Sequence, residues 1–215
     1  MKSIISTLLC SILFVLYSNA QGVFKPVDEK NIVLITDKLK ASTQSVKSLQ
    51  TDFVQSKTIS VLEETIESKG VMYYKSPGSI RWEYLSPNQY IFVVNNQKIS
   101  VKAGESATKK FDANANRFSK EISDIMLSGI NGMEIMESKK FTPVFLSSDR
   151  QICIQLTPVK RQMRQMLSQI SFFFDINTYA IQSIEMLDGN GDKTQIRFVN
   201  KKENIPVDDE KFTIN

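Results

Sequence analysis

Residues with well-known catalytic chemistry are scarce in this chain, and carboxylates are the main candidates. The sequence contains no histidine, which excludes Ser-His-Asp catalysis, Cys-His catalysis and imidazole metal sites. Two adjacent acidic pairs, Glu63-Glu64 and Asp208-Asp209, have the residue types that glycoside hydrolysis uses. Because neighbouring side chains of a strand point to opposite faces, we interpret these pairs as solvated surface groups. The sequence therefore favours a binding protein over an enzyme.

Metal and disulfide chemistry is also poorly supported. The segment Asp188-Gly189-Asn190-Gly191-Asp192 begins like a calcium loop, but Lys193 and Val199 stand where that loop needs glycine and glutamate. Between two strand-like segments, it is more typical of a hairpin turn. Outside the N-terminal apolar segment Cys153 has no cysteine partner, and we interpret it as a small buried hydrophobe. We expect no metal and no cofactor.

The most informative segment lies between Pro77 and Pro87, where the residues alternate as in a β-strand. Arg81 and Glu83 point to one face of that strand. Three large side chains point to the other face: Ile80, Trp82 and Tyr84. A face of this kind must contact the protein's own core or an apolar ligand. We predict that it lines a ligand cavity.

Large apolar residues recur at period two in several other segments. The further cavity residues that we predict from them are Phe53, Met72, Tyr74, Phe172 and Phe174. A closed barrel or sandwich with a packed inner face would explain this pattern, and so would an incompletely closed barrel with helices as a lid over a cavity. Residues at helical spacing that would line the lid are Ile122, Ile125 and Met126. Methionines there and in the loop 160–167 favour the second explanation.

The elements that must position these side chains follow from the hydrophobic periodicity. Helical spacing predicts a helix over residues 28–48 and a second helical segment over 118–136. Alternation at period two, with turn residues between the segments, predicts about eleven strands in an antiparallel meander. These strands are 49–60, 65–75, 79–85, 90–94, 98–102, 109–113, 141–146, 151–157, 169–174, 180–187 and 193–200. The predicted fold is mainly β, a single-domain incomplete antiparallel barrel with a helical lid.

The first 20 residues have the pattern of a secretory signal peptide. A positive start is followed by an apolar run over residues 4–16 and by Ser18-Asn19-Ala20, so we expect cleavage after Ala20 and an exported domain over 21–215. The net charge of +4 is too small for a nucleic-acid binder. The loop 160–167 alternates basic and apolar residues, which fits contact with a membrane or partner complex, and equally a solvated hairpin tip.

An ordered set of short motifs resembles one known family. The motifs are Phe53-Val54-Gln55, Gly70-Val71-Met72-Tyr73-Tyr74-Lys75-Ser76-Pro77-Gly78, Arg81-Trp82-Glu83-Tyr84, Pro87, Leu156-Thr157-Pro158 and Phe212. Together they resemble the periplasmic outer-membrane lipoprotein carrier family, the LolA-like proteins, over nearly the whole of residues 21–215. The resemblance implies an open barrel whose apolar cavity binds lipoprotein acyl chains, with Ile80 and Trp82 at cavity-lining positions.

The resemblance also implies a pathway and its partners. A monomeric carrier would receive cargo from an inner-membrane ABC-type lipoprotein release complex and pass it toward an outer-membrane acceptor. Well-known members have an arginine directly before the first proline, which helps to hold the lid closed, whereas this chain has Ser76. Another contact would then hold the lid. A related lipid-binding, glycolipid-binding or envelope-stress-sensing module on the same scaffold is the alternative, and a packed structural barrel is a third.

Overall fold

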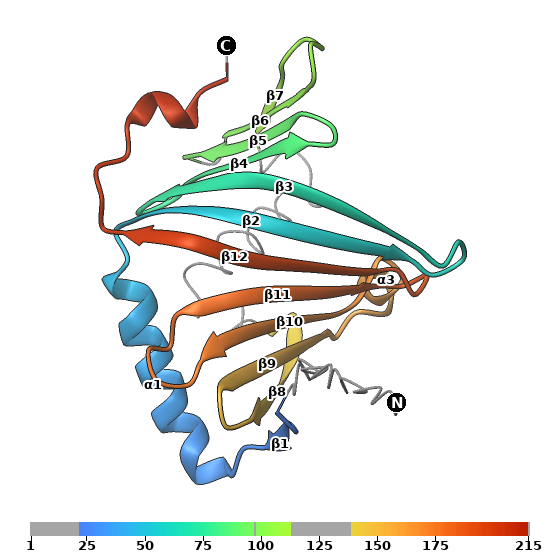
Figure 1. Cartoon of the computed structure of the whole chain (residues 1–215). Coiled ribbons are helices and arrows are strands. Elements are labelled where there is room, and N and C mark those ends of the chain that lie inside the picture. The colour runs from blue at the N-terminus through green and yellow to red at the C-terminus, as the bar shows by residue number, and fades with distance from the viewer. Residues whose placement is uncertain (1–21, 97, 113–138, 215) are drawn as a thin grey trace, which may run out of the picture.

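The computed structural model describes residues 22–96, 98–112 and 139–214. One antiparallel sheet of 12 strands dominates it, with one long helix beside the sheet (Figure 1). The strands are β1 (Lys25–Pro26), β2 (Ser48–Ile59), β3 (Glu64–Lys75), β4 (Ser79–Ser86), β5 (Tyr90–Asn95), β6 (Lys98–Ala103), β7 (Lys109–Asp112), β8 (Phe141–Ser147), β9 (Gln151–Pro158), β10 (Leu167–Asp175), β11 (Ile181–Asp188) and β12 (Lys193–Glu203). The helices are α1 (Glu29–Ser45), the short α3 (Arg161–Arg164) and the 3-10 helix η2 (Asp209–Phe212).

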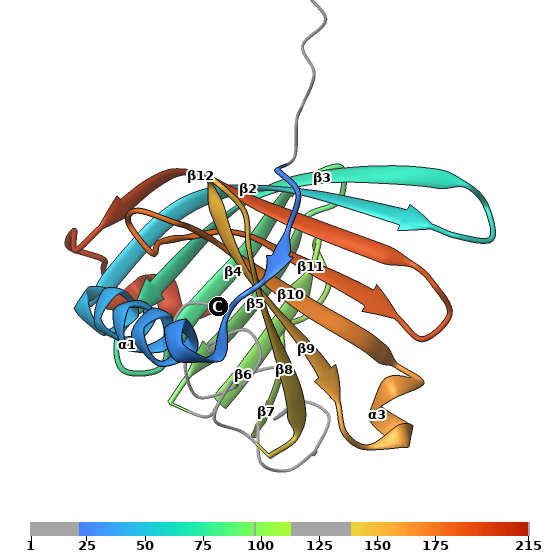
Figure 2. The ribbon, with the colours of Figure 1, turned by 90° about the horizontal axis from the view of Figure 1, so that it is seen from below.

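The sheet curves into a barrel that does not close. The strand order is β1-β8-β9-β10-β11-β12-β2-β3-β4-β5-β6-β7, so β1 and β7 are the two edges and do not pair with each other. At the centre, β12 and β2 bring the two ends of the chain together and place Phe198 opposite Phe53. Figures 1 and 2 show α1 at the end of the sheet where β2 begins, away from the outer tip of the β2–β3 hairpin. This is the predicted incomplete antiparallel barrel.

The predicted strands agree with the structure, with ends that differ by at most three residues. The two-residue strand β1, which pairs with β8, is too short to produce a periodic pattern and was not predicted. The predicted loop over 160–167 connects β9 to β10, but it contains the one-turn helix α3, and Leu167 already belongs to β10. The predicted signal peptide over 1–20 and the helical segment 118–136 lie outside the described residues.

Helix α1 begins as predicted and ends earlier than predicted. Asp28 precedes its first residue, but Val46 takes an extended conformation and ends the helix after Ser45, not at residue 48. Ser48 instead starts β2, where its hydroxyl donates to the carbonyl oxygen of Ile205. The helix packs on the sheet through Leu39, which is completely buried. None of the described helices is both long enough and apolar enough to span a membrane.

The inner face of the sheet forms one continuous apolar core. Alternate residues of the strands from β2 to β6 and from β8 to β12 contribute to it, together with Leu39 of α1. Members from six of these strands are Phe53, Met72, Ile80, Ile154, Phe172 and Ile196. The period-two alternation in the sequence therefore assigns the inner face correctly.

A smaller apolar cluster lies on the opposite, outer face. There the C-terminal segment crosses β4 and β5 and buries Phe212 and Ile214 against Val93. Arg81 of β4 donates hydrogen bonds to the carbonyl oxygens of Lys211 and Thr213 at 3.2 and 3.4 Å. The C-terminal segment is thereby fixed to the outer face of the sheet, opposite the face on which α1 packs.

Candidate functional site

An aromatic cluster forms the centre of the inner face. The ring of Trp82 lies 4.7 Å from that of Phe53 and 6.0 Å from that of Phe198, measured between centroids. Tyr84 contacts Phe53 edge to face at 5.0 Å. Such tilted and edge-to-face arrangements are favourable for aromatic pairs. Four residues from β2, β4 and β12, far apart in sequence, thus form one large apolar surface.

Gly70 makes this cluster possible. It lies opposite Phe53 in the β2–β3 pair, and the Phe53 ring occupies the space above it. A Cβ atom on Gly70 would lie 2.4 Å from Cζ of Phe53 and 2.1 Å from the carbonyl oxygen of Glu83. Only glycine therefore lets the Phe53 ring lie flat against β3.

Trp82 brings a polar atom into this apolar surface. Its side chain is 3% exposed, and its indole Nε1 makes no hydrogen bond within the described structure. Leaving a buried donor unpaired costs on the order of 1–3 kcal/mol. The N–H is close enough to the Tyr84 hydroxyl to oppose the rise of its pKa, but without hydrogen-bond geometry. Among the described residues, the indole N–H is therefore a buried donor at the centre of the cluster that an incoming acceptor could satisfy.

Tyr84 marks the border between this apolar centre and more polar surroundings. Its hydroxyl donates to Oε1 of Gln55 at 2.8 Å. Burial raises the pKa of Tyr84 to about 12, and the charge of the nearby Tyr90 adds to this rise, while the Trp82 indole opposes it. The phenol therefore stays neutral over the physiological pH range and acts as a hydrogen-bond donor.

The other described cavity candidates belong to the same core. Each of them is at least nine-tenths buried: Met72, Tyr74, Ile80, Phe172 and Phe174. In β4, Ile80 and Trp82 point inward and Arg81 outward, as the alternation predicts. The lid candidates lie outside the described residues, and these are Ile122, Ile125 and Met126. The cavity-lining role of the whole set remains a prediction.

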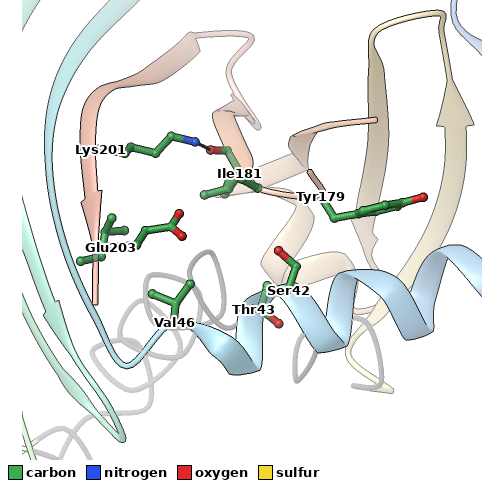
Figure 3. A pocket seen from close by; sticks show the side chains of 9 residues that line it. Ser42, Thr43, Val46, Tyr179, Ile181, Lys201 and Glu203 are labelled. Atoms are coloured by element: carbon green, nitrogen blue, oxygen red, sulfur yellow. Dashed lines mark hydrogen bonds between the residues drawn. The ribbon is translucent and has the colours of Figure 1, made fainter. Parts of the chain in front are cut away.

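A small cavity lies where α1 meets the sheet, and sequence reasoning missed it. Figure 3 shows Lys201 and Glu203 of β12 above Ser42 of α1 and Val46, which ends the helix, while the ring of Tyr179 points away from them. Its volume is about 20 Å³, enough for one water molecule. Lys201 donates to the carbonyl oxygen of Ile181 at 2.6 Å, and burial lowers its pKa, against the opposing charges of Glu203 and Asp175.

The charged residues at this cavity result from an irregularity in β12. The pairing of β12 with β2 shifts between Val199 and Lys202, and Asn200 has a φ of 55°. The shift changes which residues point inward and places Lys201 at the cavity. The sequence analysis ended this strand at residue 200, and simple alternation contains no signal for such a bulge.

A larger groove lies beside the start of α1. Its volume is about 420 Å³, and it is bordered by β1, α1, β8 and the β10–β11 turn. The apolar side chains of Leu34, Ile35 and Ile152 line it next to Lys25 and Asp28. Neither this groove nor the small cavity at Lys201 includes any predicted cavity residue. The sequence did not indicate it, because β1 creates one wall.

The segment that resembled a calcium loop is the hairpin turn between β11 and β12, as predicted. Asp192 Oδ1 accepts hydrogen bonds from the Ser60 amide at 3.0 Å and from its hydroxyl at 3.3 Å, and the Ser60 amide is the main reason for its lowered pKa. Within the described part of the chain no group of acidic or cysteine residues could hold a metal ion. Burial, and secondarily the charge of Glu185, raises the pKa of Cys153 to about 12, as expected of a buried structural thiol.

Ser76 has a structural role at the position where the resemblance implies an arginine. Its amide donates to the carbonyl oxygen of Lys47 at 2.8 Å, so it joins the end of β3 to the segment between α1 and β2. Lys47 in turn donates its amide to the side chain of Asn204 at 2.7 Å. The segment that follows α1 is thus attached to β3 and to the chain after β12 by the backbone of Lys47.

Comparisons with known proteins agree with this architecture. The family described as outer membrane lipoprotein carrier protein LolA matches residues 44–215. No curated protein matches the sequence. Among solved structures, MucB is similar with a TM-score of 0.50 and 11% identity, over 86% of this chain and 63% of that chain. At this identity the likeness shows the fold alone.

Two further solved structures are similar to this chain over nearly the whole of their own length. A DUF1329 family protein from Desulfovibrio piger has a TM-score of 0.49 and 12% identity, over 85% of this chain and 97% of that chain. The lipoprotein LppX of Mycobacterium tuberculosis has a TM-score of 0.46 and 10% identity, over 84% and 100%. The match over residues 44–215 places this chain in the outer membrane lipoprotein carrier protein LolA family.

Proposed function

We propose that this protein is a periplasmic carrier that binds the acyl chains of lipoproteins and ferries them from the inner toward the outer membrane. Family membership supports a carrier that binds lipid. The observation that carries the proposal is the continuous apolar inner face of an open sheet, with the aromatic cluster around Trp82 at its centre. A bound acyl chain would pack against the inner-face side chains in place of α1.

Burial of an acyl chain is so favourable that its release requires help from a partner. Each methylene group that leaves water contributes about 0.8 kcal/mol, so a chain of about 16 carbons gains on the order of 12 kcal/mol. A protein can release such a ligand only if a partner shifts it toward an open state. Helix α1, held to the core by Leu39 and to the sheet by few described contacts, is suited to such movement.

The proposal includes the partners and the location. We infer an inner-membrane ABC-type release complex as donor, an outer-membrane acceptor, a monomeric carrier, and export through a signal peptide cleaved after Ala20. The role is one of binding and not of catalysis, which agrees with a sequence that has no histidine.

Native mass spectrometry of the protein after gentle extraction tests this function. We expect a bound acylated protein or lipid, and uptake of an apolar fluorescent probe after delipidation. A protein that carries nothing and binds no probe would contradict the proposal. A glycolipid in place of an acylated protein would favour the related lipid-binding module on the same scaffold.

Trp82→Phe provides a sharper test at a single atom. The change keeps an aromatic ring but removes the unpaired N–H, so we expect similar stability and about fivefold to tenfold weaker cargo binding if a cargo carbonyl accepts from the indole. Phe198→Leu is the matched control, because it reduces the same cluster without removing a donor. Equal losses in both variants would show that the N–H makes no contact with cargo. Ile80→Glu and Trp82→Glu would mainly destabilise the fold, because both residues are buried, so these variants do not test cargo binding.

A further inference from the structure

At the end of the barrel opposite α1, three of the tips are hydrogen-bonded together. The amide and hydroxyl of Ser60 in the β2–β3 tip bond to Asp192 in the β11–β12 tip. The amide of Gly189 in that second tip donates to the carbonyl oxygen of Met166, just after α3. A Cβ atom on Gly189 would lie 2.0 Å from the carbonyl oxygen of Gln165, so the tips are in close contact. They form one platform, which we name the hairpin end.

The hairpin end exposes large apolar side chains at its outermost points. Val61 and Leu62 form the turn of the β2–β3 hairpin and are 84% and 64% exposed. Figures 1 and 2 show this hairpin projecting beyond the neighbouring strands. Val159 and Met166, on either side of α3, are also more than half exposed. Exposed apolar residues gathered at one end of a protein mark a contact with a partner or a membrane.

Basic residues surround α3 at the same end. The five basic side chains of this region are Lys139, Lys140, Lys160, Arg161 and Arg164. Neither residues 139–148 nor residues 151–174 contain an aspartate or glutamate. The acidic residues of the platform lie on the other two tips, with Asp188 and the buried Asp192 in the β11–β12 tip and Glu63 and Glu64 at the β2–β3 turn. The α3 side of the platform therefore has a local positive charge.

We propose that the hairpin end docks on an anionic lipid bilayer, with Val61 and Leu62 in the interfacial layer and α3 against the lipid phosphates. In a membrane surface the lipid phosphates lie outside the acyl chains. Basic side chains beside exposed apolar side chains can therefore contact both layers at once. A two-residue apolar tip is too small to bury the area that a stable protein interface requires. Docking at this end leaves α1, at the opposite end of β2, free to move.

Cosedimentation of the purified protein with vesicles tests the proposal. We expect binding to phosphatidylglycerol mixed with phosphatidylcholine, and weaker binding to phosphatidylcholine alone. Val61→Ser with Leu62→Ser should weaken binding to anionic vesicles about tenfold or more. Lys160→Gln with Arg161→Gln should weaken it about tenfold. All four residues are exposed, so the variants should fold as the parent does.

Matched controls come from the opposite end. Val33 and Leu34 of α1 are 67% and 54% exposed, so Val33→Ser with Leu34→Ser removes similar apolar surface there. Lys47→Gln with Lys202→Gln removes two exposed charges. Both control pairs should bind vesicles as the parent does. Equal losses in the control and hairpin-end variants, or no vesicle binding at all, would overturn the proposal.

A fluorescence measurement shows whether the tip itself enters the bilayer. A Leu62→Trp variant should show a blue-shifted emission and quenching by brominated lipid when anionic vesicles are added, whereas the buried Trp82 of the parent should not respond. No change in emission would contradict insertion. If the hairpin-end variants bind vesicles normally but are no longer captured by a membrane protein complex, the partner at this end is a protein, and the proposal is overturned. No lipoprotein is present in these assays, so they are independent of the proposed cargo.

Discussion

The inner and outer faces of β4 hold their neighbours by different interactions. On the inner face, Trp82 contacts Phe53 and Phe198 through ring surfaces alone. On the outer face, Arg81 is paired with Glu83 at 2.7 Å and also donates to two carbonyl oxygens of the C-terminal segment. Apolar contacts have no direction, so a ligand can replace them without leaving a polar atom unpaired. Hydrogen-bonded contacts cannot be exchanged in this way, which suits a permanent attachment.

The largest expected effect is on the inner face. Phe53→Ala should lower the free energy of unfolding by about 3–5 kcal/mol, because it leaves a cavity in the main core. Phe212→Ala on the outer face should cost less, since the C-terminal segment can detach locally without opening that core. Urea denaturation measures both variants. The comparison between the faces would fail if Phe212→Ala were the more destabilising change.

Gly70→Ala should be the next largest effect. The added methyl group would overlap the Phe53 ring and the backbone of β4, so we expect a loss of about 1–3 kcal/mol. Gly78→Ala is the matched control, because no atom lies within 4 Å of the Cβ position there. Thermal denaturation of the two variants side by side tests the packing argument. Similar melting temperatures would show that Phe53 can move aside at little cost.

Arg81→Gln tests the outer face directly. We expect a loss of about 1–2 kcal/mol, because the change removes a largely buried ion pair with Glu83 and hydrogen bonds to the C-terminal segment. Lys69→Gln, which breaks an exposed pair with Glu67, should change stability by less than about 0.5 kcal/mol. Faster hydrogen exchange should be confined to the C-terminal segment and its β4–β5 contacts. Loss of protection throughout the inner core would contradict a separable outer attachment.

The smallest expected effect is a dependence on alkaline pH. The folded protein raises the pKa of Tyr84 from 10.0 to about 12, so between these values the unfolded chain releases a proton that the folded protein keeps. This contribution to stability is complete below pH 10 and is lost as the pH rises toward 12. Tyr84→Phe should therefore lose less stability over this range in urea titrations. Cys153, on the outer face of β9, also has a raised pKa. Cys153→Ala should therefore also reduce the loss of stability, in this case from pH 9 upward.

The sequence was sufficient to predict those elements whose structure depends only on residues close together in the chain. In β4, alternation between Pro77 and Pro87 identified both the strand and its two faces, because side chains of a strand must alternate. The hairpin at Asp188 to Asp192 was predictable for a similar reason, since turn residues between two strands leave few alternatives. The predicted end of α1 was wrong because Ser48 donates a hydrogen bond to the distant Ile205 and pairs with Lys75 in the sheet, which favours a strand there.

Residues brought together by long-range contacts were not predictable. The small cavity at Lys201 depends on a bulge in β12, and the groove beside α1 depends on the two-residue strand β1. The hairpin end joins segments around Ser60, Met166 and Gly189 that no sequence period connects. Val61 and Leu62 are apolar in the sequence, but only their place at a projecting tip shows that they are exposed.

By itself, the sequence determined the strands, the faces of their side chains, and the absence of histidine chemistry. These properties follow from backbone geometry and residue type, which act within a few residues. Only the tertiary structure decided that Phe53 lies against Gly70, that the indole of Trp82 has no partner among the described residues, and that three tips form one platform. Such features depend on which strands become neighbours, because contact between distant segments is decided by the packing of the whole sheet.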